Sequence, residues 1–309
     1  MSVTVIIPSR NVEAEIAECL KGINRAYEVI LVDNSSDDTR RIAEHLGVRI
    51  IESEELPPLA RNLGAGSANG EILAFLDSDC TPFNDWIPNA MKHFEDESVG
   101  MVVGPTLTQE KDIMYQIPSL ALSTFFGGGI AKNRWRKGEF HYTDEREVEG
   151  SNLFIRKSVF EQVGGFSEHF GAEEQFLADK VSKLHKIVYA PECRVYHRRT
   201  PLFRPFIGQL YFYAYGRGWL ARNKGTKLFY YLPTLVVLFL ATSIFLSPLL
   251  TLGLMLTYSS IGAMTSLKNT NTVKEFILMT LTFPVIHITY AFGFLRGLLA
   301  RSQKKGRRK

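Results

Sequence analysis

Short apolar runs alternate with more polar, helix-like stretches along the first eighty residues. The runs are Val3–Pro8, Val29–Val32, Val48–Ile51 and Ile72–Leu76, and each has the length of a strand. Between the first two runs, Ile16, Leu20 and Ile23 recur at the spacing of one helix face. Strands that alternate with helices predict βαβ units, and therefore an α/β domain with a largely parallel sheet.

Polar residues follow three of these strands at their carboxyl ends. Pro8-Ser9-Arg10 closes the first, Asp33 the second and Asp77-Ser78-Asp79 the fourth. Ligands of open α/β sheets bind beyond such ends, so we expect these groups to line one crevice. Side chains two apart on an extended segment point the same way, so Asp77 and Asp79 are placed to share one divalent cation. Their oxygen ligands suit Mg²⁺ or Mn²⁺.

An isolated Asp-x-Asp after a strand is more often a turn than a metal site, so the neighbouring segments decide. A dinucleotide-binding dehydrogenase is disfavoured, because it needs Gly-x-Gly-x-x-Gly after the first strand. Pro8-Ser9-Arg10-Asn11 stands there instead, and Gly64-Ala65-Gly66 lies too far along the chain.

Several segments, in order and spacing, resemble the donor-site motifs of family 2 glycosyltransferases. These segments are Val5–Asn11, Leu31–Thr39, Ala60–Ala65 and Leu76–Asp79, followed by Glu149–Arg156 and Val163–Phe166. The resemblance covers roughly residues 3–220. It implies the GT-A fold, a Rossmann-like and mostly parallel α/β sheet, and the transfer of a sugar from a nucleotide-sugar to a hydroxyl group.

The resemblance also implies roles for individual residues on the donor side. Asp79 would hold the metal, Asp77 would lie near the ribose and the metal's waters, and Asp33 would accept from a base N–H. The residues implied at the nucleotide-sugar are Pro8, Ser9, Arg10, Asp33, Arg61, Asp77, Asp79 and Arg217. A metal at Asp79 would neutralise the charge that builds on the diphosphate leaving group.

Arg61 has an alternative interpretation in the sequence, and Arg217 lies in a segment that departs from a known motif. Arg61 has the fixed charge and the fork that suit a phosphate, but a surface ion pair with Glu54 or Glu55 would also explain it. Arg217 is expected to reach the donor phosphates. Its surroundings differ from the Gln-x-x-Arg-Trp motif of processive relatives, because Gln209 and Trp219 are too far apart. That spacing argues against processive synthesis.

On the acceptor side, Gly171–Leu177 resembles the Glu-Asp-x-x-Leu segment of the family, which places Glu174 as the catalytic base and Glu173 before it. A like-charged neighbour and partial burial raise the pKa of such a carboxylate towards neutrality. The alternative is two glutamates favoured by a helix N-terminus. One base opposite one leaving group predicts inversion at the anomeric carbon.

Further residues complete the expected site. Gly150, Ser151 and Asn152 are implied on the acceptor side, and His197 as a ligand that completes the metal shell. A lone histidine is also a common hydrogen-bonded structural residue, so both interpretations of His197 stand.

The last third of the chain is predicted to enter a membrane. Leu228 to Leu267 contains no charged residue, and Phe276 to Leu295 is a second uncharged stretch of spanning length. Ser247-Pro248 divides the first stretch. The expected organisation is a GT-A domain at 1–202, an amphipathic interfacial segment at 203–227, two or three transmembrane helices (about 229–246, 249–267 and 276–295) and a basic tail at 296–309.

Basic residues predict the orientation. Eight Lys or Arg and no acid lie between Arg194 and Lys227, and seven lie between Arg296 and Lys309. The positive-inside rule places both clusters in the cytoplasm, which requires an even number of crossings. Clusters that flank apolar spans favour anionic lipid headgroups over nucleic acid as the partner. A strand directly after Met1 leaves no room for a signal peptide, and three scattered cysteines fit a reducing compartment.

We therefore expect an inverting, metal-dependent glycosyltransferase, integral to the cell membrane, with its catalytic domain in the cytoplasm. Its donor would be a UDP-sugar rather than a GDP-sugar, and its acceptor a lipid-linked or membrane-proximal glycan. Two alternatives remain: a polyprenyl-phosphate glycosyltransferase that makes the first lipid-linked sugar, and a membrane subunit that binds a nucleotide-sugar without turnover.

Overall fold

The computed structural model describes residues 1–168, 171–225 and 227–300 of the 309-residue chain. These residues form two compact units. The first contains residues 1–109 and 133–198, and the second contains residues 110–132 and those from 199 on. The chain therefore leaves the first unit, contributes one segment to the second, and returns before it leaves for the last time. The 3-10 helix η1 (Gly129–Trp135) lies where the chain returns.

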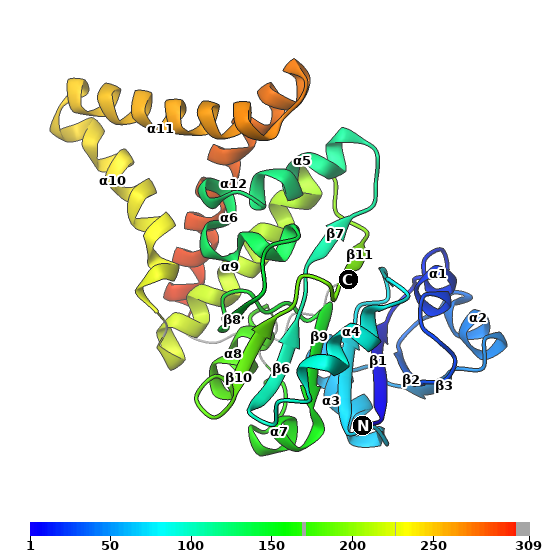
Figure 1. Ribbon diagram of the computed structural model, residues 1–309. Coiled ribbons are helices and arrows are strands. Elements are labelled where there is room, and N and C mark those ends of the chain that lie inside the picture. The colour runs from blue at the N-terminus through cyan, green and yellow to red at the C-terminus, as the bar shows by residue number, and fades with distance from the viewer. Residues whose placement is uncertain (169–170, 226, 301–309) are drawn as a thin grey trace. The chain divides into compact units, whose positions relative to one another are not determined.

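The first unit is built on an eight-stranded mixed sheet with the order β3-β2-β1-β4-β9-β6-β10-β8 (Figure 1). Its strands are β1 (Val3–Ser9), β2 (Glu28–Asp33), β3 (Arg49–Glu52), β4 (Ile72–Leu76), β6 (Val99–Val103), β8 (His141–Thr143), β9 (Asn152–Arg156) and β10 (Lys186–Tyr189). Strands β9 and β8 run antiparallel to their neighbours, and the other pairs are parallel. The four strands predicted from the apolar runs are confirmed as β1 to β4.

Helices cover both faces of this sheet. One layer is α1 (Ile16–Lys21), α2 (Thr39–His45) and α4 (Trp86–His93), and the other is α3 (Pro57–Ser67), α7 (Lys157–Gln162) and α8 (Glu173–Val181). Successive strand side chains point to opposite faces. In β4, for example, Ile72, Ala74 and Leu76 pack into the first layer, while Leu73 and Phe75 pack into the second. Burial on both faces explains why the strand is continuously apolar.

A second, three-stranded sheet has the order β5-β11-β7. It consists of β5 (Cys80–Pro82), β11 (Val195–His197) and β7 (Thr106–Thr108). Strand β5 begins four residues after β4 ends, and it pairs antiparallel with β11 so that Cys80 faces His197. This register brings a histidine from late in the unit next to the Asp77-Ser78-Asp79 segment.

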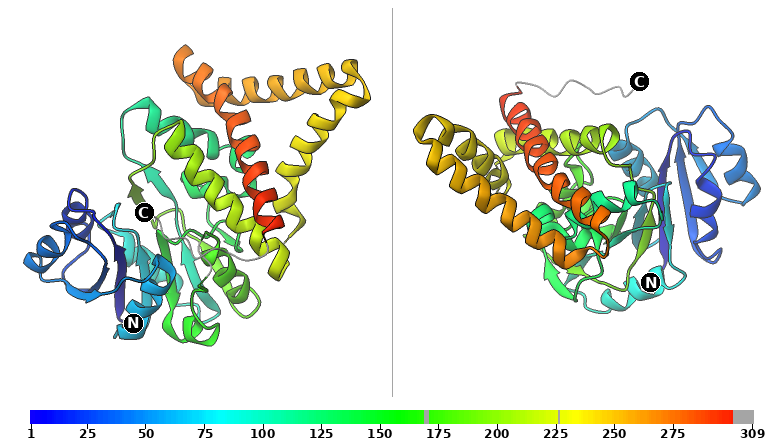
Figure 2. Two further views of the ribbon diagram at one scale, coloured as in Figure 1. Left: turned by 180° about the vertical axis from the view of Figure 1, so that it is seen from behind. Right: turned by 90° about the horizontal axis from the view of Figure 1, so that it is seen from above.

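The second unit consists of helices. They are α5 (Ile113–Leu122), α6 (Phe125–Gly128), α9 (Arg204–Lys224), the 3-10 helix η2 (Leu228–Tyr231), α10 (Leu232–Leu246), α11 (Pro248–Asn269) and α12 (Val273–Leu299). Helix α9 packs along α12, whereas α11 crosses between the outer ends of α10 and α12 (Figure 2). Residues from α5, α9 and α12 share an apolar core that includes Ile117, Phe206 and Phe283.

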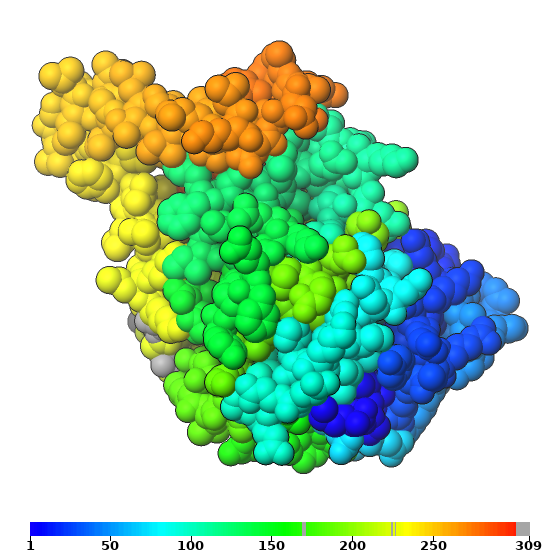
Figure 3. Space-filling model, viewed as in Figure 1, coloured from blue at the N-terminus to red at the C-terminus, as the bar shows by residue number. Residues whose placement is uncertain are grey.

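Three segments of this unit are long and apolar enough to cross a membrane. They are Leu228–Leu246, Pro248–Asn269 and Val273–Leu299, and the first two are separated at Ser247-Pro248. Helices α10 and α11, yellow to orange in the space-filling view of Figure 3, expose large apolar side chains that include Phe239, Phe245 and Leu249. A surface of this kind is stable in lipid and unfavourable in water. The basic tail at 296–309 lies largely outside the described residues.

Candidate functional site

The polar residues predicted at the strand ends lie at one edge of the main sheet. Ser9 ends β1, Asp33 ends β2, and the two are paired in the register of the parallel strands. Asp77 follows β4, which is the other neighbour of β1. Because the carboxyl ends of parallel strands meet at the same edge, three segments far apart in sequence converge there. Pro8, within β1, and the exposed Arg10 lie beside Ser9.

Asp33 is buried and held by hydroxyl groups. The hydroxyls of Ser9 and Ser35 both donate to Asp33 Oδ1 at 2.6 Å, and the Ser35 backbone N–H donates to Oδ2 at 3.1 Å. Arg40 lies 3.4 Å from Oδ2. These contacts fix the orientation of the carboxylate. Ser35 and Arg40 were not predicted; the signal for Ser35 was its place two residues after Asp33 in a turn rich in polar acceptors.

Arg61 joins the donor-side and acceptor-side segments. Its Nη2 lies 2.6 Å from Asp77 Oδ1 and its Nη1 lies 3.5 Å from Glu173 Oε1. The side chain is only 6% exposed, and its guanidinium packs on the Phe166 ring. The alternative interpretation, a surface ion pair with Glu54 or Glu55, is therefore wrong. Contact with a donor phosphate stays a prediction, and it would require Arg61 to act from within this buried ion-pair cluster.

Asp79 and His197 form the best candidate for a metal centre. Asp79 Oδ1 lies 3.3 Å from His197 Nε2, and the Cys80 thiol lies within the same cluster. The antiparallel pairing of β5 with β11 produces this proximity, because it places His197 directly opposite Cys80. Asp77, whose side chain is 31% exposed, lies two residues before Asp79 in the sequence.

This cluster offers a cation ligand atoms of different kinds, a carboxylate oxygen, an imidazole nitrogen and a thiol sulfur. Carboxylate oxygen suits both Mg²⁺ and Mn²⁺, whereas an imidazole nitrogen is a better ligand for the transition metal. The residues present therefore fit a divalent cation and favour Mn²⁺. Asp79 and His197 would hold it, with Asp77 near its remaining positions.

Glu173 and Glu174 open α8 and are both buried, at 4% and 8% exposure. Glu173 accepts a 2.6 Å hydrogen bond from the Gly171 backbone N–H in addition to its contact with Arg61. Burial, and then the charge of Glu174, raise the pKa of Glu173 to about 8, against the opposing effects of Arg61 and the backbone N–H groups. Glu174 accepts from the side-chain amide of Gln175 at 3.2 Å. The neighbouring carboxylates therefore have different partners.

The residues predicted on the acceptor side have distinct surroundings. A Cβ on Gly150 would lie 3.1–3.3 Å from the Arg61 guanidinium, so the absence of a side chain there makes room for the ion-pair cluster. Ser151 is buried, and its hydroxyl has no hydrogen-bond partner among the described residues. The amide of Asn152 accepts from the Trp86 indole and donates to the backbone of Pro105 and Cys193. Asn152 thus holds β9 to its surroundings, and its contact with an acceptor stays a prediction.

One predicted site residue lies in the other unit. Arg217 is on α9, among the helices that include the candidate membrane spans. Its predicted contact with the donor phosphates stays a prediction.

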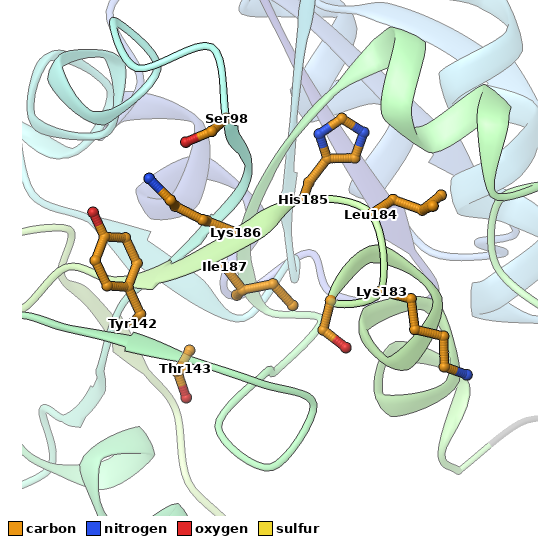
Figure 4. Close-up of a pocket in the computed structure, with 9 residues that line it drawn as sticks. Ser98, Tyr142, Thr143, Lys183, Leu184, His185, Lys186 and Ile187 are labelled. Carbon is orange, nitrogen blue, oxygen red and sulfur yellow. The ribbon is translucent and has the colours of Figure 1, made fainter.

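A shallow surface hollow elsewhere on the first unit has a different character (Figure 4). It lies at the amino ends of β6 and β10, the opposite edge of the sheet from Asp33 and Asp77. Its basic residues are already paired, Lys183 with Asp179 and Lys186 with Asp96. The hollow therefore offers no unpaired positive charge to a phosphate group.

Comparison with known proteins agrees with this geometry. Residues 4–164 match the family described as Glycosyl transferase family 2. Glycosyltransferase AglE of Haloferax volcanii is 30% identical over 186 residues, which are 54% of this chain and 56% of that protein. The glucosyl-dolichyl phosphate glucuronosyltransferase of the same organism is 25% identical over 197 residues, 62% of this chain and 58% of that protein. The chain thus spans little more than half the length of these relatives.

Among solved structures, the mannosyltransferase PcManGT from Pyrobaculum calidifontis, in complex with GDP-Man and Mn²⁺, superposes with a TM-score of 0.61. The superposition covers 97% of this chain and 88% of that one at 19% identity, so it supports the fold alone. The mixed sheet with its two helical layers is accordingly GT-A-like, followed by three long apolar helices. A family match over more than half of the chain shows that the chain belongs to glycosyl transferase family 2, and the fold agrees with it.

Proposed function

We propose that the protein transfers a sugar from a nucleotide-sugar to a hydroxyl group of a lipid-linked or membrane-proximal glycan, with inversion at the anomeric carbon. The observation that carries the proposal is the cluster of Asp79 and His197, 3.3 Å apart, beside Asp77 at the carboxyl edge of the sheet. A relative named for its action on a glucosyl-dolichyl phosphate supports a lipid-linked acceptor. Resemblance to the family favours UDP-sugars, and a fold neighbour that binds GDP-Man makes GDP-sugars the next choice.

The donor would bind across the ends of β1, β2 and β4. Asp33, held by Ser9 and Ser35, would accept an N–H of the base, and Pro8 and Arg10 would pack on the nucleoside. Asp77 would lie near the ribose. Mn²⁺ or Mg²⁺ bound at Asp79 and His197 would act as a Lewis acid towards the diphosphate as it leaves.

Glu174 would remove the proton from the acceptor hydroxyl. It lies in the first turn of α8, in the same ion-pair neighbourhood as Arg61 and Glu173. Attack by the deprotonated oxygen on the face opposite the diphosphate inverts the anomeric carbon. The three apolar helices would hold the enzyme at a membrane, where a lipid-linked acceptor resides.

The test is release of nucleoside diphosphate by detergent-solubilised protein supplied with UDP- and GDP-sugars and a lipid-linked acceptor. Wild type, Asp79→Asn and a control, Asp85→Asn, are compared with Mn²⁺ and with chelator. Asp85 has a half-exposed carboxylate (54%) six residues further on, and its ion-pair partner, Arg194, is 4.0 Å away. We expect release from one donor that needs the metal, that Asp79→Asn reduces at least about 100-fold and that Asp85→Asn leaves intact.

The outcomes separate the alternatives. Release that survives both chelation and Asp79→Asn would contradict the metal site. A nucleotide that binds with Mn²⁺ but is never turned over with any acceptor would point to a binding subunit.

A further inference from the structure

Gln175, the third residue of α8, lies in an unusual place for a buried amide. Its side chain is 2% exposed. Its Nε2 donates to the Val148 carbonyl at 3.1 Å and to Glu174 Oε1 at 3.2 Å. The amide therefore joins the carboxylate predicted to be the base to the backbone just before Glu149 and Gly150.

The burial of this amide has an energetic cost that core packing does not explain. Burying a polar group is unfavourable unless it is hydrogen-bonded, and Gln175 Oε1 has no partner among the described residues. The nearby Leu177 and Ala178 belong to an apolar core cluster, where an apolar side chain would avoid that cost. A buried polar atom without a hydrogen-bond partner calls for an explanation, and a role beside a catalytic group is one such explanation.

The two glutamates show what Gln175 contributes. Glu173 is held by Arg61 and by the Gly171 N–H. Glu174 accepts its hydrogen bond from Gln175 instead. Glu173 and Arg61 are charged neighbours of Glu174. They are paired with each other, and Arg61 is also paired with Asp77. A neutral donor at Gln175 orients the Glu174 carboxylate without adding a charge to this crowded site.

We propose that Gln175 is a positioning residue of the transferase reaction. It holds Glu174 in the orientation needed to accept the proton of the acceptor hydroxyl. This inference rests on the proposed function. Gln175 makes no contact with the donor-side residues Asp33, Asp77 or Asp79 among its hydrogen bonds, so its effect belongs to turnover and not to donor binding.

The experiment compares wild type with Gln175→Met and Gln175→Glu in the full-length protein. Methionine keeps the length but loses the donor, and glutamate keeps the shape but puts an oxygen where Nε2 was. Glu174→Gln and the double variant Glu174→Gln/Gln175→Met complete a double-mutant cycle, which measures the coupling between the two side chains. Asn89→Leu is the control, because Asn89 is another buried amide that donates to a backbone carbonyl, that of Glu192, away from this cluster.

Three readouts are taken: thermal unfolding, binding of UDP and GDP with Mn²⁺ by calorimetry, and kcat and KM over a range of pH. For whichever Gln175 variant keeps the wild-type unfolding transition, we expect nucleotide binding within about threefold of wild type and kcat lower by about 10- to 100-fold. The double variant should lose no more than Glu174→Gln alone.

Other results would overturn the inference. A wild-type kcat in either variant would do so. So would a double variant whose loss of kcat equals the sum of the two single losses on a free-energy scale. A fall in kcat equal to that of Asn89→Leu would indicate a purely structural effect. Failure of the proposed function is distinguishable, because wild type itself would then show no turnover.

Discussion

At the residue scale, the environment of each carboxylate decides its chemistry. Glu173 and Glu174 are neighbours, yet one lies against a guanidinium and a backbone N–H and the other against a neutral amide. Similar reasoning applies to Asp33, which is held by two hydroxyls, and to Asp79, which lies beside an imidazole. Because the immediate partners of a carboxylate set its orientation and the stability of its charge, these side chains differ in chemistry although they are of one kind.

The raised pKa of Glu173 predicts a pH dependence of stability. Burial and the charge of Glu174 raise this pKa from about 4.5 to about 8, so the folded state binds a proton that the unfolded state has lost. The contribution of Glu173 to stability is therefore full below about pH 4.5 and is lost as the pH rises towards 8. We expect Glu173→Gln to be more stable relative to wild type at pH 9 than at pH 5.

Thermal unfolding in detergent at both pH values measures this effect, and Glu161→Gln, at an exposed glutamate on α7, is the control. Equal shifts of Glu173→Gln at the two pH values would mean that Glu173 titrates normally.

Gly150 offers a second prediction at this scale. A methyl group there would lie 3.1–3.3 Å from the Arg61 guanidinium, so Gly150→Ala must displace the ion pair with Asp77 by a few tenths of an ångström. We expect kcat/KM to fall about tenfold, because misplacement of this size is costly to a preorganised site. Stability should fall by about 1–2 kcal/mol.

Steady-state kinetics and thermal unfolding measure both effects. Gly66→Ala is the matched control, since a Cβ on Gly66 of α3 would meet nothing within 4 Å. An activity of Gly150→Ala as high as that of Gly66→Ala would show that the Arg61 cluster tolerates movement.

At the element scale, glycines bring α9 and α12 into close contact. A Cβ on Gly218 of α9 would collide with the Phe294 carbonyl, and a Cβ on Gly297 of α12 would collide with that of Tyr215. Gly293 and Gly297 lie four residues apart on α12, the small-residue spacing that lets helix backbones approach in membranes. In the first unit, contact between two elements likewise decides which residues meet, because the pairing of β5 with β11 places His197 next to Asp79.

This contact predicts a specific sensitivity of α12. Gly297→Ala should destabilise the helical unit by about 1–3 kcal/mol, because overpacking must push the helices apart. Gly253→Ala is the control, since nothing lies within 4 Å of a Cβ at that position of α11. The thermal transition in detergent can be followed by tryptophan fluorescence, to which Trp219 contributes, and the Trp219 backbone N also lies against Gly297. Identical transitions for the two variants would mean that the contact between α9 and α12 is loose.

At the scale of the whole molecule, charge and hydrophobicity are segregated along the chain. The eight basic residues between Arg194 and Lys227 directly precede the first candidate span. The chain also passes three times between its units, because residues 110–132 supply α5 and α6 to the helical one. The two units are therefore not simply consecutive along the chain, and no pattern in the sequence predicted this insertion.

The charge distribution predicts that the first unit faces the cytoplasm. All three native cysteines are buried, so an engineered cysteine at the exposed Glu97 would be the accessible thiol among the described residues. We expect a membrane-impermeant maleimide to label Glu97→Cys in inverted vesicles or permeabilised cells but not in intact cells. Labelling in intact cells would place the unit on the other side.

The sequence by itself determined the four N-terminal strands, the acidic residues at their ends and the positions of the apolar spans. These features depend on local periodicity and length, which a contiguous stretch of chain records directly. The order of family motifs added the expected fold. The strands β6, β8, β9 and β10 were not predicted, because their place depends on partners distant in sequence.

Only the tertiary structure decided which groups meet. Arg61 pairs with Asp77 and Glu173 and not with the nearby Glu54 or Glu55, because α3 packs its side chain inward, against α8. His197 reaches Asp79 through the register of two short strands, and Gln175 reaches Glu174 because both are buried at the start of one helix. Distances and burial of this kind arise from packing between elements, which no local pattern of residues encodes.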